Sequence, residues 1–311
     1  MSNKGKVISV NISEEKGTVK HPVPEIVIDT SGVVNDAHAG LWHRQVSLLS
    51  QEDIDCFSRE MGREINPGEF AENITVGGID LGKVAILDRF RINQVELEVT
   101  QIGKECHGNN CAIYREVGKC VMPKKGLFCR VINNGQIKAG DCIEYIPRPL
   151  QIAVITLSDR ASAGVYSDRS GPRAKQILEE HFAGKKWHLQ IKNLVLADDA
   201  NKLTKKLNKS IAGQMDVILT LGGTGVGPRD ITPEVVTAVC DKVIPGIMEN
   251  IRIKYGGQKP SALLSRSIAA IAGQTQIYAL PGSVRAVEEY LSEILKTMEH
   301  TIFMIHGMDV H

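Results

Sequence analysis

The strongest constraint on the fold is an apolar strand that leads through a glycine-rich loop into a helix. Residues 219–234 have the sequence LTLGGTGVGPRDITPE, and the apolar run 217–221 predicts the strand. Thr232 as N-cap, Pro233 at the first helical position and Glu234 in the first turn favour a helix start. Glycines let the backbone approach a ligand, and helix N-termini favour anions. The segment therefore predicts a loop that binds phosphate or carboxylate groups.

This loop matches neither of two common nucleotide-binding motifs. No Gly-Lys-Ser/Thr follows the glycines, and Pro228 and Arg229 break the spacing of a dinucleotide fingerprint. A glycine-rich turn that only connects a strand to a helix is the simplest alternative. The Arg229-Asp230 pair and the helix start behind it favour a binding loop instead.

Strands and helices alternate over residues 148–311. The run 152–157 is apolar except at Thr156, as in a strand buried on both faces. Further strands are expected at 189–196, 217–221 and 276–280, and helices at 174–182, 201–211, 233–240 and 284–298. This order predicts a three-layer α/β domain with a mainly parallel sheet. In such a sheet the loops after the strands meet at the carboxyl edge, where ligands bind.

Residues 1–147 show a different pattern, with many short strands and turn signals. The segment 90–99 nearly alternates apolar and polar residues, as in a half-buried strand. Gly77-Gly78 and Asn134-Gly135 predict hairpin turns, and Ser50 is the expected N-cap of a helix at 51–61. This pattern predicts a mostly-β, barrel-like or sandwich domain.

A proline-rich segment separates the two patterns. Prolines two residues apart in Pro147-Arg148-Pro149-Leu150 can sustain neither a helix nor a central strand, so residues 147–150 are the expected linker. We therefore expect two domains, at 1–147 and 148–311.

Composition excludes several classes of partner. The 311 residues carry a formal net charge of +1, which favours neither nucleic acid nor an anionic membrane. The N-terminus lacks the apolar segment of a secretory signal, and no apolar run approaches the length of a membrane span. We therefore expect a cytoplasmic protein. Seven cysteines, an odd number, favour free thiols over a disulfide framework.

The loops at the predicted carboxyl edge carry carboxylates, arginines and backbone donors. They are Ser158-Asp159-Arg160, Asp198-Asp199, the segment from Gly222 to Asp230, and Pro281-Gly282-Ser283. Carboxylates repel a phosphate unless a cation lies between them, so the set predicts Mg²⁺ bound with a triphosphate. Each aspartate alone has a simpler alternative role, as a helix N-cap or a solvated surface group. Asp198 in particular precedes a helix that it could cap.

Several motifs in residues 150–311 resemble the MogA/MoaB family of molybdenum-cofactor proteins. They are ITLSDRASAGVYSD at 155–168, the glycine-rich segment through Glu234, Ile244-Pro245-Gly246, Leu264-Ser265-Arg266 and Leu280-Pro281-Gly282. The resemblance implies a molybdopterin-binding α/β domain, commonly trimeric, with molybdopterin adenylyltransferase activity. In that reaction the terminal phosphate of molybdopterin attacks the α-phosphate of MgATP, and pyrophosphate leaves. One departure is Leu221, where many members carry Thr or Ser.

The resemblance also implies site residues. The two functional aspartates of the family fall on Asp198 and Asp230, which are expected to be catalytic and to hold Mg²⁺ partly through the ATP phosphates. The expected substrate-binding residues are Ser158, Asp159, Gly222, Gly223, Thr224, Gly225, Arg229, Ser265, Pro281 and Gly282. The alternative is an inactive carrier or sensor that only binds molybdopterin or the cofactor. The presence of both aspartates favours the enzyme.

The first half resembles a MOSC domain, the β-rich module shared with the C-terminal part of molybdenum cofactor sulfurases. The motifs are RQVSLL at 44–49, GEFAENI at 68–74, VTQIGKEC at 99–106, GLFCRV at 126–131 and AGD at 139–141. The resemblance implies that Cys106 carries sulfur as a persulfide, and Lys104 or His107 would favour its thiolate. Whether this domain transfers sulfur or only binds cofactor stays open.

Zinc is the alternative ligand of the cysteine-rich segment. Cys106, His107, Cys111 and Cys120 could supply four ligands, but no Cys-x-x-Cys pair is present. Cys56, Cys129 and Cys142 are expected to be small core residues. Expected protein partners are a cysteine desulfurase, molybdenum-insertion proteins or molybdoenzymes, and further copies of the chain in a homotrimer.

Overall fold

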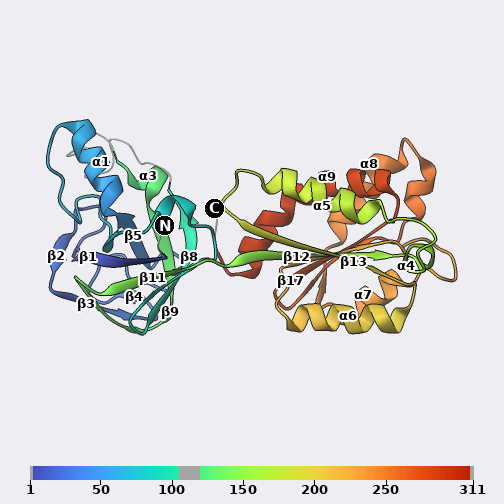
Figure 1. Cartoon of the computed structure of the whole chain (residues 1–311), viewed down its shortest axis with the longest axis horizontal. Coiled ribbons are helices and arrows are strands. Elements are labelled where there is room, and N and C mark those ends of the chain that lie inside the picture. The colour runs from blue at the N-terminus through green and yellow to red at the C-terminus, as the bar shows by residue number, and fades with distance from the viewer. Residues whose placement is uncertain (1–2, 105–119, 309–311) are drawn as a thin grey trace. The chain divides into compact units, whose positions relative to one another are not determined.

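The computed structural model describes residues 3–104 and 120–308. The chain divides into two compact units between Arg148 and Pro149, one residue after the boundary expected from the sequence (Figure 1). Pro149 and Leu150 are not linker residues as expected, because they begin strand β12 (Pro149–Leu157). Proline is tolerated as the first residue of a strand, where no ladder hydrogen bond is lost.

Unit 1, residues 1–148, is a closed β-barrel. Its ring consists, in order, of β1 (Lys4–Ile12), β11 (Cys142–Ile146), β7 (Arg89–Ile92), β8 (Val95–Ile102), β9 (Leu127–Asn133), β5 (Val46–Ser50) and β6 (Ile74–Gly77). Pairing of β1 with both β11 and β6 closes the ring. The edge strand β2 (His21–Val23) pairs with β1, and β10 (Gly135–Lys138), β3 (Glu25–Asp29) and β4 (Gly32–Val33) form a second, small sheet. The expected barrel-like fold is confirmed.

The hairpins of unit 1 differ from those expected. The alternating segment 90–99 folds as two paired strands, β7 and β8, which turn at Asn93 with a left-handed φ of 52°. Neither Gly77-Gly78 nor Asn134-Gly135 joins paired strands, because β6 pairs with β1 and β5, and β10 pairs with β3. A turn signal shows where the chain changes direction, but it does not choose the pairing partner.

Helices cover part of the barrel. Helix α1 (Gln51–Met61) has the expected bounds, and the Ser50 hydroxyl accepts a hydrogen bond from the Asp53 N–H at 3.0 Å. Gly62 ends the helix in the left-handed conformation that favours glycine. Ile54 is the residue that α1 buries. The other helices of the described part of unit 1 are short: η1 (Leu81–Lys83) and α3 (Met122–Lys125).

Unit 2, residues 149–311, is an α/β unit built on one sheet. The strand order is β13 (His188–Leu196), β12, β14 (Val217–Leu221), β17 (Thr275–Leu280), β16 (Ile268–Ala272) and β15 (Lys242–Val243). The first four strands pair in parallel, whereas β16 and β15 join antiparallel at the far edge. The parallel strands place their carboxyl ends at a common edge, which positions the loops of the site.

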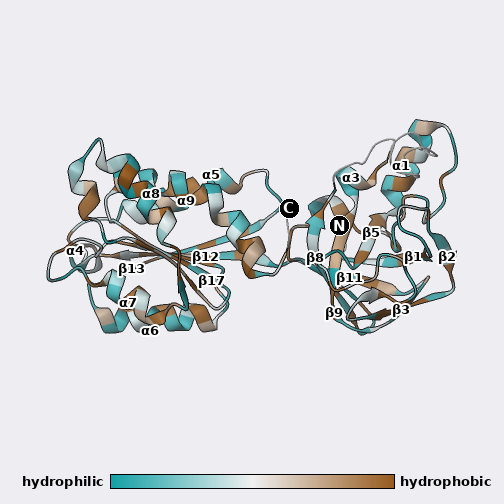
Figure 2. Ribbon diagram, turned by 180° about the vertical axis from the view of Figure 1, so that it is seen from behind, coloured by the Kyte–Doolittle hydropathy of each residue, from teal (hydrophilic) through white to brown (hydrophobic). Residues whose placement is uncertain are grey.

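Helices pack on both faces of this sheet (Figure 1). One face carries α5 (Ser170–Phe182), α8 (Pro245–Gly256) and α9 (Val284–Ile305), and the other carries α6 (Ala200–Ala212) and α7 (Thr232–Val239). Figure 2 shows the strands between these layers largely in the hydrophobic colour, and every residue of β14 and β17 is buried. The short helices α4 (Asp159–Ser162) and η3 (Pro260–Leu264) lie in loops. No helix in residues 3–104 and 120–308 is long and apolar enough to cross a membrane.

Candidate functional site

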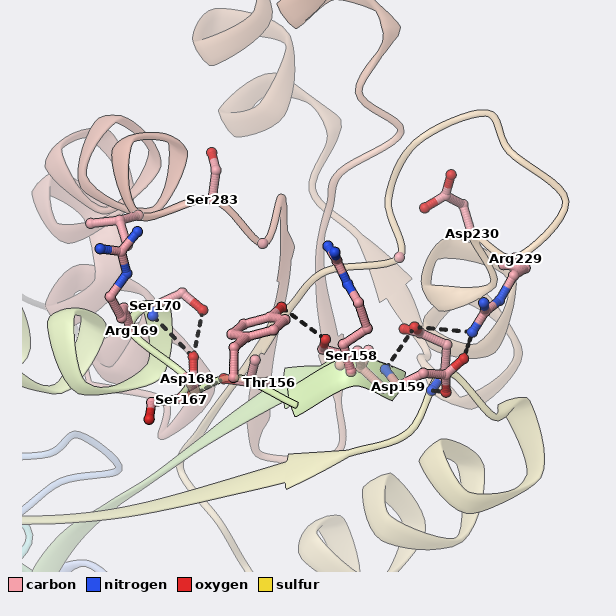
Figure 3. A pocket seen from close by; sticks show the side chains of 17 residues that line it. Thr156, Ser158, Asp159, Ser167, Asp168, Arg169, Ser170, Arg229, Asp230 and Ser283 are labelled. Carbon is pink, nitrogen blue, oxygen red and sulfur yellow. Dashed lines mark hydrogen bonds and ion pairs between the residues drawn. The ribbon is translucent and has the colours of Figure 1, made fainter. Parts of the chain in front are cut away.

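The four loops that the sequence places at the carboxyl edge of the sheet line one pocket of unit 2. Its cavity volume is about 670 Å³, and residues that follow β12, β13, β14 and β17 all contribute. Of the expected site residues, it contains Ser158, Asp159, Asp198, Gly223, Arg229, Asp230 and Gly282 (Figure 3). The two aspartates expected to be catalytic therefore lie in the same pocket.

Asp159 and Asp198 fix each other across two loops. The Asp198 N–H donates to Asp159 Oδ1 at 2.9 Å, and the Asp159 N–H donates to Asp198 Oδ2 at 3.2 Å. Arg229, from the glycine-rich loop, forms ion pairs with Asp159 and, at 3.6 Å, with Asp198. These contacts join three of the four loops and hold their charged groups at the pocket wall.

Asp198 does not cap the following helix. Asp199 takes that role, because its Oδ1 accepts a hydrogen bond from the Lys202 N–H at 3.0 Å. The alternative of Asp198 as a cap is therefore wrong, and its carboxylate is available to the pocket. Burial and the negative charge of Asp230 raise the pKa of Asp198 above its ordinary value. Two carboxylates that repel each other across a pocket favour a cation between them.

Close contacts explain two of the glycines in the loop. A Cβ atom at Gly225 would lie 2.7 Å from Asp230 Oδ2, and one at Gly223 would lie 2.5 Å from Thr232 Oγ1. Gly223 also has a φ of 63°, which disfavours any side chain there. Asp230 Oδ2 itself accepts a hydrogen bond from the Gly227 N–H at 2.8 Å. The loop thus curls tightly around the carboxylate that it carries.

Thr232 is not the N-cap of α7, contrary to the sequence expectation. It is the first residue of the helix, and no side chain caps that end. Its hydroxyl instead donates to the carbonyl of Gly222 at 2.9 Å, and its N–H donates to the carbonyl of Gly223 at 3.0 Å. Thr232 therefore fastens the start of α7 to the start of the glycine-rich loop.

Arg266 binds the carbonyl groups of the same loop. Its Nε donates to the Gly225 carbonyl and its Nη2 to the Asp230 carbonyl, both at 2.6 Å, while its backbone N–H donates to the Thr224 carbonyl at 2.8 Å. It also forms an ion pair with Glu234. Arg266 lies in one of the family-like motifs, but no local sequence pattern connects it with a loop 41 residues earlier.

Four of the other expected substrate-binding residues line a second pocket. This cavity of about 350 Å³ is lined by Thr224, Gly225, Ser265 and Pro281, and Ser283 lines both pockets. Its remaining walls are mixed: Val226, Ala262, Leu264, Ala286 and Tyr290 are apolar or aromatic, whereas Lys259, Ser261 and Glu289 are polar. Gly222 lines neither pocket. Its N–H donates to the Leu280 carbonyl at 2.9 Å and joins the ends of β14 and β17.

The large pocket also contains residues that sequence reasoning did not select. Tyr166 places its hydroxyl 3.0 Å from Ser158 Oγ, and the guanidinium carbon of Arg160 lies 5.3 Å from the centre of the Tyr166 ring. Asp168 and Arg169 line the pocket at the start of α5. Tyr166, Arg160 and Asp168 lie inside the family-like motif at 155–168. The motif therefore marked the right segment, but only the contacts in the structure show which of its residues line the pocket.

The predicted sulfur-carrier residue of unit 1 cannot be placed. Cys106, with His107 and Cys111 of the zinc alternative, lies outside the described residues. Cys129 is fully buried, and burial and the charge of Glu98 raise the pKa of its thiol, as expected for a core residue. Cys56 and Cys142 are exposed, so the expectation of core positions is wrong for both. Within residues 3–104 and 120–308, no group of three or more His, Cys, Asp or Glu side chains could hold a metal ion.

Unit 1 contains a buried ion pair that the sequence did not reveal. The side chains of Lys20 and Asp36 are each 1% exposed and in contact. Asp36 also accepts hydrogen bonds from the backbone N–H groups of Ser13, at 3.1 Å, and His38, at 3.0 Å. Burial alone would raise the pKa of Asp36, but hydrogen bonds from His38 and Lys20 hold it well below its usual range. Both residues lie in loops, where no periodicity marks burial.

Comparison with known proteins identifies relatives of both units. Residues 153–300 match the profile described as "Probable molybdopterin binding domain", and residues 35–144 match the MOSC domain. The molybdopterin adenylyltransferase of Helicobacter pylori strain J99 is 35% identical over 159 residues, which span 51% of this chain and 89% of that protein. The chain belongs to the MogA/MoaB family.

Other relatives of this MogA/MoaB-family chain have the same extent. Molybdenum cofactor biosynthesis protein B of Staphylococcus carnosus is 36% identical over 154 residues, 49% of this chain and 87% of that protein. A solved structure of the molybdopterin biosynthesis Mog protein from Mycobacterium ulcerans has 36% identity, covers 50% of this chain and 98% of its own, and gives a TM-score of 0.45. The names of these relatives refer to the synthesis of the molybdenum cofactor.

Proposed function

We propose that unit 2 is a molybdopterin adenylyltransferase. An oxygen of the terminal phosphate of molybdopterin attacks the α-phosphorus of ATP, the bond from that phosphorus to the bridging oxygen of the β-phosphate breaks, and pyrophosphate leaves. The observation that carries this proposal is the meeting of Asp198, Asp230 and the glycine-rich loop in one pocket of about 670 Å³. The names of the relatives support the same activity.

The residues of this pocket fit a bound magnesium ion. Asp198 and Asp230 supply carboxylate oxygens, which Mg²⁺ prefers, and their mutual repulsion favours a cation. Two carboxylates do not complete an octahedral shell, but phosphate oxygens of ATP and water supply the rest in sites of this type. When bound, Mg²⁺ would offset the negative charge that develops on the phosphates. Arg229 neutralises part of the charge of Asp159 and keeps the two loops together.

The two pockets suit a reaction that joins two substrates. The larger one is lined mainly by charged and hydroxyl groups, as phosphates require, while the smaller one combines apolar residues and the ring of Tyr290 with a few polar groups. Flat heterocycles are bound by apolar and aromatic walls with few polar groups. We therefore place the phosphoryl chemistry in the larger pocket and one of the two heterocycles in the smaller one.

Unit 1 is proposed to handle sulfur or cofactor for the same pathway. This proposal rests on its MOSC domain and on the position of Cys106 in the family motif, with a persulfide on that cysteine as the carried group. A cysteine desulfurase and molybdenum-insertion or molybdoenzyme proteins would then be partners. We also propose that the protein forms a homotrimer through unit 2 and that it is located in the cytoplasm.

The test is pyrophosphate release by the full chain with molybdopterin and MgATP. We expect release that depends on molybdopterin, together with formation of adenylylated molybdopterin seen by mass spectrometry. Asp198→Asn should reduce it strongly. Asp199→Asn is the matched control, because Asp199 is the next residue and asparagine also caps helices well, so this variant should retain activity.

A second candidate function is a carrier that binds molybdopterin without adenylylating it. Tight binding of molybdopterin with no pyrophosphate release by the wild-type protein would establish that function and refute the enzyme.

A further inference from the structure

Charged residues divide the large pocket into two ends. Figure 3 shows Asp159, Arg229 and Asp230 toward one end and Arg169, Ser170 and Ser283 toward the other. At the first end, which we call the carboxylate end, the aspartates outnumber the one arginine, and Arg229 is paired with two of them. A free anion is repelled there unless it brings its own cation.

The other end, which we call the arginine end, has the opposite character. The guanidinium of Arg169 lines the pocket, and in the part of the chain that the structure describes it forms no ion pair. The carboxylate of the neighbouring residue, Asp168, is occupied by hydrogen bonds from other protein groups. It accepts hydrogen bonds from Thr156 Oγ1 at 2.8 Å, from the Ser170 hydroxyl at 2.9 Å and from the N–H groups of Ser170 and Gly171.

Further groups of the large pocket favour an anion. Arg160 lines the same pocket, and its contact is with the Tyr166 ring at 5.3 Å, which leaves its charge without a carboxylate partner among the described residues. Ser167 and Ser283 contribute hydroxyl groups to the lining. The N-terminal ends of α5 and α9, helices of 13 and 22 residues, also begin at this pocket and add partial positive charge.

We propose that Arg169, supported by Arg160, binds the phosphate monoester of the acceptor substrate. This inference rests on the proposed adenylyl transfer. A triphosphate that carries Mg²⁺ belongs at the carboxylate end, whereas a phosphate monoester without a metal needs side-chain cations. Two guanidinium groups offset part of its charge, near −2 at neutral pH, and bind phosphate through directed N–H donors.

The arrangement has a consequence for specificity. Two polyanionic substrates that must react repel each other, and separate cation sources at the two ends reduce that repulsion. Arg169 would therefore determine that the acceptor carries a phosphate group, while it contributes little to the affinity for ATP.

The test compares Arg169→Gln with Arg173→Gln in the full chain. Arg173 lies one turn later on α5, but its Nε pairs with Glu288 at 2.6 Å and it does not line the pocket. Loss of a charge-assisted hydrogen bond at Arg169 should raise the KM and the Kd for molybdopterin by at least about tenfold. The KM for MgATP should stay unchanged, and Arg173→Gln should change neither constant.

Direct binding separates this inference from the proposed activity. Molybdopterin is titrated into each variant, and inorganic phosphate is added as a competitor. Phosphate should displace molybdopterin from the wild-type protein, but it should not compete with the molybdopterin that still binds to Arg169→Gln. If phosphate displaces molybdopterin from the wild type but not from Arg169→Gln, and the wild type releases no pyrophosphate, the proposed adenylyl transfer is refuted while the role of Arg169 in phosphate binding is supported. A rise in the KM or Kd for MgATP alone, or no change in either substrate, would overturn the inference.

Discussion

The two units treat clustered charge in opposite ways. In unit 1 the side chains of Lys20 and Asp36 are each 1% exposed, and the carboxylate is surrounded by donors from the protein. In unit 2 the side chain of Asp198 is 20% exposed, that of Asp159 42% and that of Arg229 66%, and aspartates repel one another across an open pocket. The first cluster is complete without a ligand, and the second is not. Charge left unsatisfied at a pocket is the pattern expected of a functional site.

The largest expected effect would test the first half of this comparison. Asp36→Asn should destabilise unit 1 by about 3–5 kcal/mol, because it leaves the Lys20 ammonium buried without its counter-charge. Chemical denaturation of the full chain should show an earlier transition for unit 1. Pyrophosphate release by unit 2 should be unaffected under native conditions. An unchanged transition would mean that the buried pair is not a stabilising element.

The same pair should give unit 1 an acid-labile stability. Hydrogen bonds hold the pKa of Asp36 below its ordinary value, so its contribution is present at neutral pH and is lost as pH falls through the depressed pKa. The difference in unfolding free energy between the wild type and Asp36→Asn should therefore shrink on acidification.

A somewhat smaller effect is expected in unit 2, and on turnover rather than stability. Asp230→Asn should lower the rate of adenylyl transfer by roughly 10²–10³-fold, the usual cost of losing a group that stabilises transition-state charge. Thermal unfolding should be the same as in the wild type or slightly improved, because a repulsion with Asp198 is removed. A variant that loses folding stability and activity together would show that Asp230 is structural, like Asp36.

Gly223→Val tests whether the loop between the charged groups must approach its ligand closely. The new Cβ would lie 2.5 Å from Thr232 Oγ1 at a residue with φ 63°, so the loop should shift and molybdopterin binding should weaken. Gly246→Ala is a control, since a Cβ there would meet no atom within 4 Å beyond its chain neighbours and the backbone of its own helix, and its φ is not positive. Normal affinity in Gly223→Val would make the loop a simple connector.

The smallest expected effect is the pH dependence of Asp198→Asn. The pKa of Asp198 is raised in the folded state, so its ionisation costs stability as pH rises from the ordinary aspartate range through the raised pKa. The melting temperature of Asp198→Asn should therefore exceed that of the wild type at neutral pH, and the difference should vanish in acid. A constant difference across this range would mean that Asp198 ionises as it does in the unfolded chain.

Regular elements were the part of the fold that the sequence predicted best. The bounds of α1 and β14 are as expected, because Ser50 caps the helix and a short, mostly apolar run that ends at a glycine pair is typical of a strand buried on both faces. Pairing was not predictable at Asn134-Gly135, since the partner of β10 is β3, more than 100 residues earlier in the chain. Local patterns determine local conformation, whereas pairing depends on the closed barrel.

The same limit applies to the candidate site. Strand ends and a glycine-rich loop were enough to select Asp159, Asp198 and Asp230, because the order of parallel strands brings such loops together. The sequence could not show that Asp199, and not Asp198, caps α6. Nor could it identify Arg169 as an unpaired cation, because that property depends on where every nearby carboxylate points.

Arg266 also bears on the order in which the site forms. Three of its donors bind carbonyls of the glycine-rich loop, yet it follows that loop by about 40 residues and lies two residues before β16. During folding, the loop can therefore gain its final shape only when Arg266 and the start of β16 are in place. In hydrogen exchange, we expect the backbone amides of the loop from Gly223 to Asp230 to gain protection together with those of β16.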